Sequence, residues 1–225
     1  MVELTWQGDV AVVRMGDGVT DDENRFDGEA VARWHAVIDE VEAKEGPCAL
    51  VTTGSGKFYS NGLDLEWLGT DGNDARGMLR DLHRLWGRIL GFGGVTVAAV
   101  NGHAFGAGAL LSSAHDRIVM RADRGYWCMP EVDIHLPVGD AMSKLLLANI
   151  PRQAILTALV TAHRFTGPEA LEAGLAAEIA PADEVLERAV AHAAALAHKD
   201  REVIAVHKRL LHGATIDALD GETLA

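Results

Sequence analysis

The sequence is poor in cysteine, in long apolar runs and in basic side chains. Only Cys48 and Cys128 occur among its 225 residues, too few and too far apart for a disulfide framework or a metal knuckle. No apolar run is long enough to span a membrane, and the opening MVELTWQGDV lacks the pattern of a signal or transit peptide. These absences predict reduced thiols, no metal site, no membrane association and a cytoplasmic location.

The shortage of positive charge narrows the range of partners. Lys and Arg number 20 against 33 Asp and Glu, a net charge of −13, which repels nucleic acid phosphates and acidic membranes. An anionic ligand would therefore need individual Lys or Arg contacts. The hydrophobic content of 48% over 225 residues is enough for one large core, so a single structural unit is expected.

The first part of the chain alternates between strand and helix patterns. A glycine turn at Gly8 separates apolar runs at 4–6 and 10–15, which predicts an opening hairpin at a sheet edge. Apolar residues spaced three or four apart predict an amphipathic helix over 29–44. Strands are expected at 49–52 and 95–100, and helices at 75–90 and 106–114. This alternation indicates βαβ units, a parallel sheet and an α/β fold.

After Pro137 the pattern becomes helical. Helices are expected at 140–148, at 152–161, from Pro168, at 183–198 and at 201–212, with Gly174 and Gly213 marking helix ends. We therefore expect residues 1–137 to form the core that carries the site. Residues 138–225 would form a helical region of the same structural unit.

Two glycine-bearing turns are the main functional signal. KFYSNGLDLEWL (57–68) and NGHAFGAGALL (101–111) each follow a strand-like run, so together they can present two backbone N–H groups to one substrate oxygen. Ligand-free strand-to-helix turns fit the same spacing equally well. GSGK at 54–57 is not a phosphate loop, because Val51 and Phe58 stand where Gly and Ser or Thr are needed. The glycines at 102, 106 and 108 do not match the dinucleotide pattern either.

A lone carboxylate in an apolar stretch is the third feature. Glu131 lies in YWCMPEVDIHLP, and apolar neighbours raise the pKa of a carboxyl toward a value useful for proton transfer. A cap of the following turn, or an ion pair with Arg124, would also explain a carboxylate at this position.

These motifs, in this order, resemble the crotonase (enoyl-CoA hydratase/isomerase) superfamily, and GKFYSNGLDLEW with HDRIVMRADRGYWCMPEVDI most resembles plant-type 3-enoyl-CoA to 2-enoyl-CoA isomerases. The resemblance implies a ClpP/crotonase fold of repeated ββα units with a C-terminal helical trimerisation region, and a homotrimer or dimer of trimers. It makes Glu131 the acid/base, and the N–H groups of Leu63 and Ala107 the oxyanion hole for an acyl-CoA thioester. It implies no cofactor beyond the CoA of the substrate, which would be contacted by Lys57, Ser60, Asn61, Gly62, Leu65, Gly106 and Leu110.

One departure from the family pattern bears on the reaction. Hydratases of the superfamily carry a second glutamate where this chain has Leu110, and the two carboxylates position water. Leucine cannot do this, whereas moving a proton from C2 to C4 needs one base, so isomerisation in unsaturated fatty acid β-oxidation is favoured. A hydratase that recruits Asp133 or Asp140, and a non-catalytic CoA-binding scaffold, remain as alternatives. The roles of Asp133, His135 and Asp140 stay open.

Overall fold

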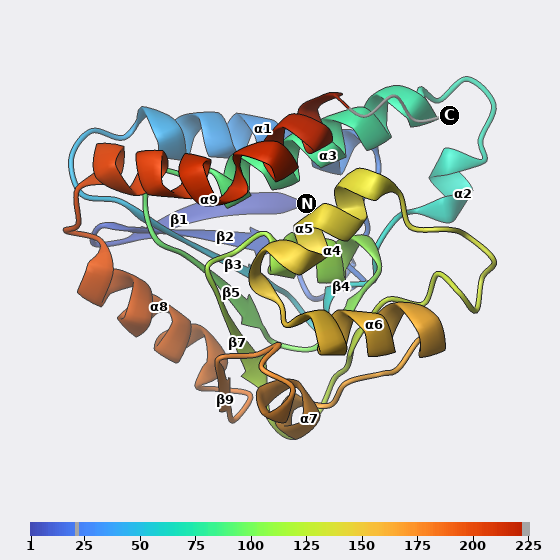
Figure 1. The fold of residues 1–225 in the computed structure, drawn as a ribbon. Coiled ribbons are helices and arrows are strands. Elements are labelled where there is room, and N and C mark those ends of the chain that lie inside the picture. The colour runs from blue at the N-terminus through green and yellow to red at the C-terminus, as the bar shows by residue number, and fades with distance from the viewer. Residues whose placement is uncertain (21–22, 222–225) are drawn as a thin grey trace.

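A six-stranded sheet forms the centre of the computed structural model, which describes residues 1–20 and 23–221 (Figure 1). Its strand order is β1-β2-β3-β5-β7-β9. β1 and β2 are antiparallel, and each later neighbour is parallel. The strands are β1 (Val2–Gln7), β2 (Val10–Met15), β3 (Ala49–Gly54), β5 (Thr96–Val100), β7 (Arg117–Arg121) and β9 (Glu178–Ala180). The predicted hairpin and parallel sheet are confirmed.

A second, parallel sheet of three short strands lies beside the first. It has the order β4-β6-β8, from β4 (Phe58–Ser60), β6 (His103–Phe105) and β8 (Trp127–Cys128). Each of these strands follows a strand of the main sheet along the chain: β4 follows β3, β6 follows β5 and β8 follows β7. This repetition of strand pairs with intervening helices is the expected ββα architecture. The two glycine-bearing turns come directly after β4 and β6.

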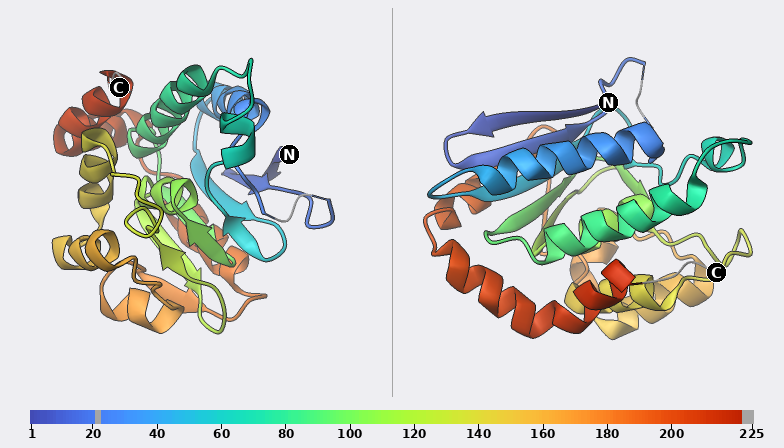
Figure 2. Two further views of the ribbon diagram at one scale, coloured as in Figure 1. Left: turned by 90° about the vertical axis from the view of Figure 1, so that its right-hand side faces the viewer. Right: turned by 90° about the horizontal axis from the view of Figure 1, so that it is seen from above.

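Helices cover both faces of the main sheet. Figures 1 and 2 show α1, α3 and α9 side by side over one face, whereas α8 crosses the other. α8 buries Val185, Ala189 and Ala193 against alternate residues of β2, β3, β5 and β7. The helices are α1 (Gly28–Ala43), α2 (Leu65–Leu68), α3 (Ala75–Leu90), α4 (Ala107–Ser113), α5 (Asp140–Asn149), α6 (Arg152–Thr161), α7 (Gly167–Glu172), α8 (Val185–Leu196) and α9 (Arg201–Gly221).

The helix boundaries follow local chemistry at most ends. Asp27 caps α1 by accepting a 2.7 Å hydrogen bond from the Ala30 N–H, and Asp74 caps α3 in the same way. The buried stripe of α1 consists of the residues whose spacing predicted it: Val31, Trp34, Val37, Ile38 and Val41. Its indole makes Trp34 one of the largest fully buried side chains of the core.

Two details of the C-terminal part differ from the prediction. β9 lies within the stretch expected to be purely helical and extends the main sheet next to β7. Its three residues are too few to show a strand period. Gly213 was expected to end a helix, but α9 continues through it to Gly221, because α9 packs along α3 and α5 and tertiary contact outweighs the low helix propensity of one glycine.

α9 is also fixed by a buried ion pair. Lys208 is only 7% exposed, and its Nζ lies 2.8 Å from Asp116 Oδ2 and donates to the Gly94 carbonyl at 2.9 Å. Burial lowers the Lys208 pKa, which Asp116 opposes. α9 is thereby joined to the loops that precede β5 and β7.

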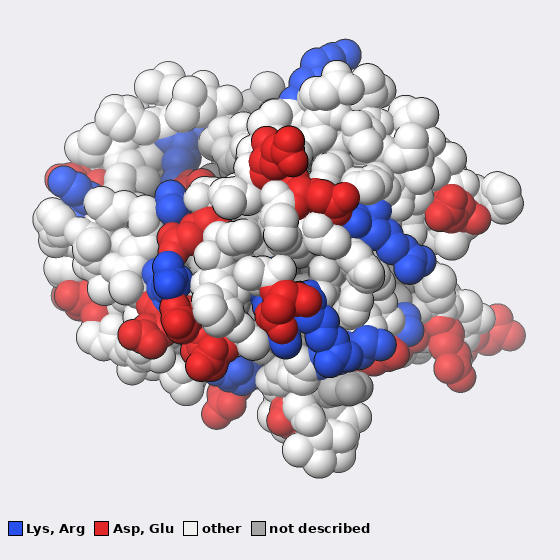
Figure 3. Space-filling view, turned by 90° about the horizontal axis from the view of Figure 1, so that it is seen from below, with Lys and Arg blue, Asp and Glu red and all other residues white. Residues whose placement is uncertain are grey.

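Charges of both signs are intermixed on the surface. On the face seen from below, acidic and basic side chains lie next to one another (Figure 3). This face therefore carries no broad basic field of the kind that nucleic acid binding uses. Exposed ion pairs also occur along α8, where Arg188 pairs with Glu184 at 2.6 Å and with Glu178 of β9 at 3.1 Å. Among the described residues, no helix is long and apolar enough to cross a membrane.

Candidate active site

The turn after β4 is held open by the segment that precedes α1. Asn61 N–H donates to Glu23 O at 2.8 Å, Phe26 N–H to Gly62 O at 2.8 Å, and Asp64 N–H to Phe26 O at 2.9 Å. These bonds leave the intervening Leu63 N–H with no acceptor in the described part of the chain. Gly62 adopts a φ of +86°, a conformation that side chains rarely allow.

Polar side chains fix the same turn from both ends. Ser60 Oγ donates to Asn24 O at 2.7 Å and accepts the Gly62 N–H at 3.2 Å. Arg25 Nη1 donates to the Leu63 carbonyl at 3.3 Å. Asp64 caps α2 by accepting from the Trp67 N–H at 3.0 Å. Leu63 thus sits in a rigid frame.

The turn after β6 meets the first one. Gly106 has a φ of +50° and precedes α4, whose first residue, Ala107, is buried with an N–H that has no acceptor among residues 1–20 and 23–221. A methyl group placed on Gly62 would lie 2.9 Å from the Phe105 carbonyl oxygen and 3.5 Å from the Ala107 nitrogen. The two turns are therefore in direct contact. Together they carry two backbone N–H groups, those of Leu63 and Ala107, that bind no acceptor within the described part of the protein.

Glu131 lies at the same place. Its Oε1 would be 3.3 Å from a methyl group on Gly106, and its buried Oε2 has no hydrogen-bond partner among the described residues. Burial raises the Glu131 pKa, as the sequence predicted. Neither competing explanation holds in the described part of the chain: the Glu131 side chain forms no ion pair with Arg124 and accepts no hydrogen bond from the turn that follows it. A carboxylate with a raised pKa and a free oxygen suits proton transfer.

The apolar setting of Glu131 differs in part from the prediction. Trp127 and Met129 are fully buried beside it, whereas Ile134 and Leu136 are 47% and 51% exposed. The backbone after Pro130 explains this difference, because it forms a single helical turn that directs these side chains outward. The turn is closed by a hydrogen bond from the Leu136 N–H to the Glu131 carbonyl, and His135 within it has a φ of +58°.

Leu110 is 2% exposed and packs in the main core. No second carboxylate stands at this position of α4, and no group of metal-binding side chains occurs among the described residues. Of the other residues expected to contact CoA, Lys57 is exposed with its Nζ 5.2 Å from the centre of the Phe58 ring, and Leu65 is exposed at the start of α2. Ser60 is fully buried and Asn61 half-buried.

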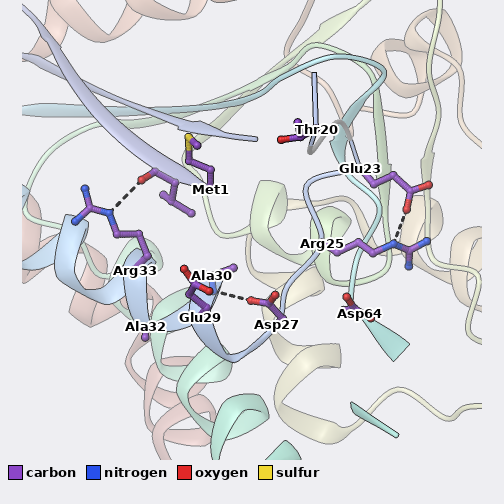
Figure 4. A pocket seen from close by; sticks show the side chains of 11 residues that line it. Met1, Thr20, Glu23, Arg25, Asp27, Glu29, Ala30, Ala32, Arg33 and Asp64 are labelled. Carbon is purple, nitrogen blue, oxygen red and sulfur yellow. Dashed lines mark hydrogen bonds and ion pairs between the residues drawn. The ribbon is translucent and has the colours of Figure 1, made fainter. Parts of the chain in front are cut away.

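Two cavities are lined by Glu131 or by Asp64, the residue after Leu63. One, of about 830 Å³, lies beside Asp64 and is lined by both acidic and basic side chains (Figure 4). In it Arg25 turns toward Glu23, and the Arg33 Nε donates to the Val2 carbonyl. The other, of about 590 Å³, is lined by Glu131 with Val132, His135, Leu136, Pro137, Val138, Ser143 and Leu159.

Asn24 and Arg25 are the site-shaping residues that the sequence did not reveal. The Asn24 amide donates to the Phe58 carbonyl at 2.8 Å and so supports the strand that leads to Leu63. Nothing in the local pattern marks these residues, because their partners lie more than 30 positions away in the sequence. The sequence indicated the two turns, and the family resemblance singled out the Leu63 and Ala107 N–H groups within them.

Comparison with known proteins agrees with this architecture. A family model described as enoyl-CoA hydratase/isomerase matches residues 6–223. Enoyl-CoA delta isomerase 3 of Arabidopsis thaliana is 32% identical over 222 residues, which cover 94% of this chain and 92% of the relative.

Solved structures share the fold. A probable enoyl-CoA hydratase of Mycobacterium tuberculosis H37Rv has a TM-score of 0.88 at 30% identity, covering 97% of this chain and 91% of that one. An apo structure of the same M. tuberculosis protein, described there as an enoyl-CoA isomerase, has a TM-score of 0.86 at 30% identity, covering 99% of this chain and 98% of that one. The ββα core is thus that of a crotonase-fold protein. With the match over nearly its whole length, the chain belongs to the enoyl-CoA hydratase/isomerase family of enzymes.

Proposed function

We propose that this enzyme is an isomerase that converts 3-enoyl-CoA into trans-2-enoyl-CoA. The observation that carries the proposal is a single carboxylate: Glu131 has a buried oxygen with no partner among residues 1–20 and 23–221, and the position on α4 where a water-activating glutamate would stand holds the buried Leu110. One base is sufficient to shift a double bond, whereas hydration also needs a positioned water. The similarity to a plant enoyl-CoA delta isomerase supports this choice.

The reaction would use the two unused backbone donors. The Leu63 and Ala107 N–H groups would donate to the thioester oxygen, whose negative charge grows as the C2 proton leaves. Glu131 would take that proton from C2 while the C3–C4 double bond moves to C2–C3, and would return it to C4. The proton count is unchanged and no oxidant is consumed. The CoA thioester supplies the acidity at C2, so no further cofactor takes part.

The two cavities suggest how the substrate lies. The acyl chain would extend from Glu131 along the cavity that includes Val132, Val138 and Leu159. The CoA moiety would leave past Asp64 toward the larger cavity, where Arg25 and Arg33 offer positive charge in an otherwise acidic wall. In the cell the product would enter the degradation of unsaturated fatty acyl chains.

A substrate comparison tests the proposal. Purified protein is given 3-hexenoyl-CoA and crotonyl-CoA in separate reactions, and products are resolved by mass. Isomerisation leaves the mass unchanged, whereas hydration adds one water. We expect 3-hexenoyl-CoA to be converted and crotonyl-CoA to be hydrated far more slowly. Comparable rates on the two substrates would refute the isomerase assignment.

One observation favours hydration as the second candidate. His135 and Ser143 line the same cavity as Glu131, so polar groups that could hold a water are present although Leu110 offers none. Replacing His135 by Ala would then abolish hydration of crotonyl-CoA and spare isomerisation. If the protein binds CoA esters but forms no product from either substrate, the non-catalytic scaffold is the better description.

We also propose that the protein works as a homotrimer or dimer of trimers. Support comes from large apolar side chains left exposed on α6 and α9: Leu156, Val160, Val206, Leu210 and Leu211. Light scattering coupled to size-exclusion chromatography would give three or six times the 24.0 kDa chain mass, and a monomeric mass would contradict the proposal.

A further inference from the structure

A buried chain of hydrogen bonds joins the two segments that carry the candidate oxyanion donors. Tyr59 Oη lies 2.7 Å from Thr52 Oγ1, which lies 3.0 Å from His115 Nε2. His115 Nδ1 lies 2.9 Å from the Leu111 carbonyl oxygen. The three side chains are at most 1% exposed. No step of the reaction described above uses them.

The direction of every proton in this chain is fixed by its last acceptor. A carbonyl oxygen cannot donate, so His115 Nδ1 must carry the hydrogen that points at Leu111. If the imidazole is neutral, Nε2 is an acceptor and Thr52 must donate to it. Thr52 Oγ1 then accepts from Tyr59, whose pKa burial raises, so it stays protonated. Burial also lowers the His115 pKa to about 4, which keeps the ring neutral near pH 7.

The chain connects three elements at the positions that matter for the site. Tyr59 is in β4, which runs directly into Gly62 and Leu63. Leu111 is in α4, the helix that begins with Ala107, and His115 follows its end. Thr52 is in β3, the middle of the main sheet, and connects the other two. The segments that carry both turns are therefore connected by hydrogen bonds to the same strand, β3.

We propose that Tyr59, Thr52 and His115 are positioning residues, which hold the Leu63 and Ala107 N–H groups in register through β4 and α4. This inference rests on the proposed oxyanion hole. The side chains act at a distance through backbone segments and touch no substrate. Oxyanion donors must be held to within about 0.5 Å to be effective, so small movements of β4 against α4 reduce turnover.

The same strand provides a matched control. Thr53 is the next residue of β3, is 1% exposed, and its hydroxyl donates to the Ala99 carbonyl at 3.0 Å. Because side chains alternate along a strand, it faces the opposite side of the sheet. Thr52→Val and Thr53→Val therefore each remove one buried hydroxyl of the same shape. Only Thr52→Val interrupts the chain of hydrogen bonds.

We expect Thr52→Val to lower kcat on the order of 10-fold with KM changed by less than about twofold, since a displaced donor costs less than the roughly 10²- to 10³-fold loss of a removed one. Thr53→Val should keep the wild-type kcat. Thr52→Ser, which restores the hydroxyl, should recover most of the loss. If Thr52→Val keeps its kcat, or Thr53→Val loses as much, the side chains have no positioning role.

A measurement on the unmodified protein covers the case in which Thr52→Val does not fold. ¹⁵N NMR of the histidine rings distinguishes the two neutral tautomers, and His115 should carry its proton on Nδ1 between pH 6 and 8. A ring protonated on Nε2, or on both nitrogens, would overturn the proposed chain.

Kinetic ratios keep this proposal separate from the isomerase assignment. The variants are compared with wild type on whichever enoyl-CoA ester the wild type converts. If the wild type hydrates but does not isomerise, the proposed function fails, and the Thr52→Val to Thr53→Val ratio still decides whether the chain positions the donors.

Discussion

Replacing Gly62 by Ala should separate the two turns, and a second glycine offers a matched control. Gly62 and Gly46 have φ values of +86° and +78°, so a methyl group imposes a similar backbone strain on both, about 1–2 kcal/mol. At Gly46 the new methyl group meets nothing within 4 Å, whereas at Gly62 it lies 2.9 Å from Phe105 O. Ordinary contact begins at 3.4 Å, so the turns must part by about 0.5 Å.

The two variants should therefore lose a similar amount of stability from backbone strain but differ in kcat. For a chain of this length, a loss of about 1–2 kcal/mol lowers Tm by about 2–8 °C, which we expect for Gly46→Ala with kcat unchanged. Gly62→Ala should lower Tm by at least as much and should lower kcat about 10²-fold, because the displaced turn moves the Leu63 N–H away from its position in the site. Calorimetry and steady-state kinetics on 3-hexenoyl-CoA give both quantities. Equal kcat values for the two variants would show that the turns do not bind the thioester oxygen.

Three further outcomes follow from the titrating groups. Glu131→Gln should reduce kcat about 10²- to 10⁴-fold. The same variant should have a higher Tm than the wild type at neutral pH. The folded-state pKa of Glu131 is raised, so the wild type loses stability as pH rises above 4.5, and the difference in Tm should vanish below that pH. A lower Tm of the variant at pH 7 would contradict burial as the cause of the raised pKa. The pH profile of kcat/KM should show an acid limb above the ordinary 4.5 of a glutamate, and a limb at or below 4.5 would argue against Glu131 as the base. Because the His115 pKa is lowered to about 4, the wild type should lose about 3 kcal/mol of unfolding free energy as pH falls from 6.5 to 4. In His115→Gln, the unfolding free energy from urea titrations should change less with pH over that window.

The parts of the fold that were predictable are those with a repeating pattern or a strong local signal. α3 and α6 have the predicted bounds, because apolar spacing and nearby glycine or proline define them. The strands β4, β6 and β8 were not predicted, since two or three residues do not show a period, and their pairing is decided by tertiary contact.

The candidate site shows the same division. Glu131 and the turns at Gly62 and Gly106 could be found in the sequence because each stands in a distinctive local stretch. Thr52 and His115 could not be linked, because they are 63 positions apart and only the tertiary fold brings them together. Sequence patterns identify the groups that face the substrate more readily than the groups that hold them in place.

The way α9 is attached has a consequence for biosynthesis. Arg201 donates to the Gly93 carbonyl across 108 positions, and Lys208 reaches Gly94 across 114. Until this helix has left the ribosome, the face of α3 that it covers lies bare and Asp116 lacks its ion-pair partner Lys208. A nascent chain that has already formed both sheets would therefore expose an apolar surface until α9 has been made, and chaperones that recognise such surfaces would be needed most before that point.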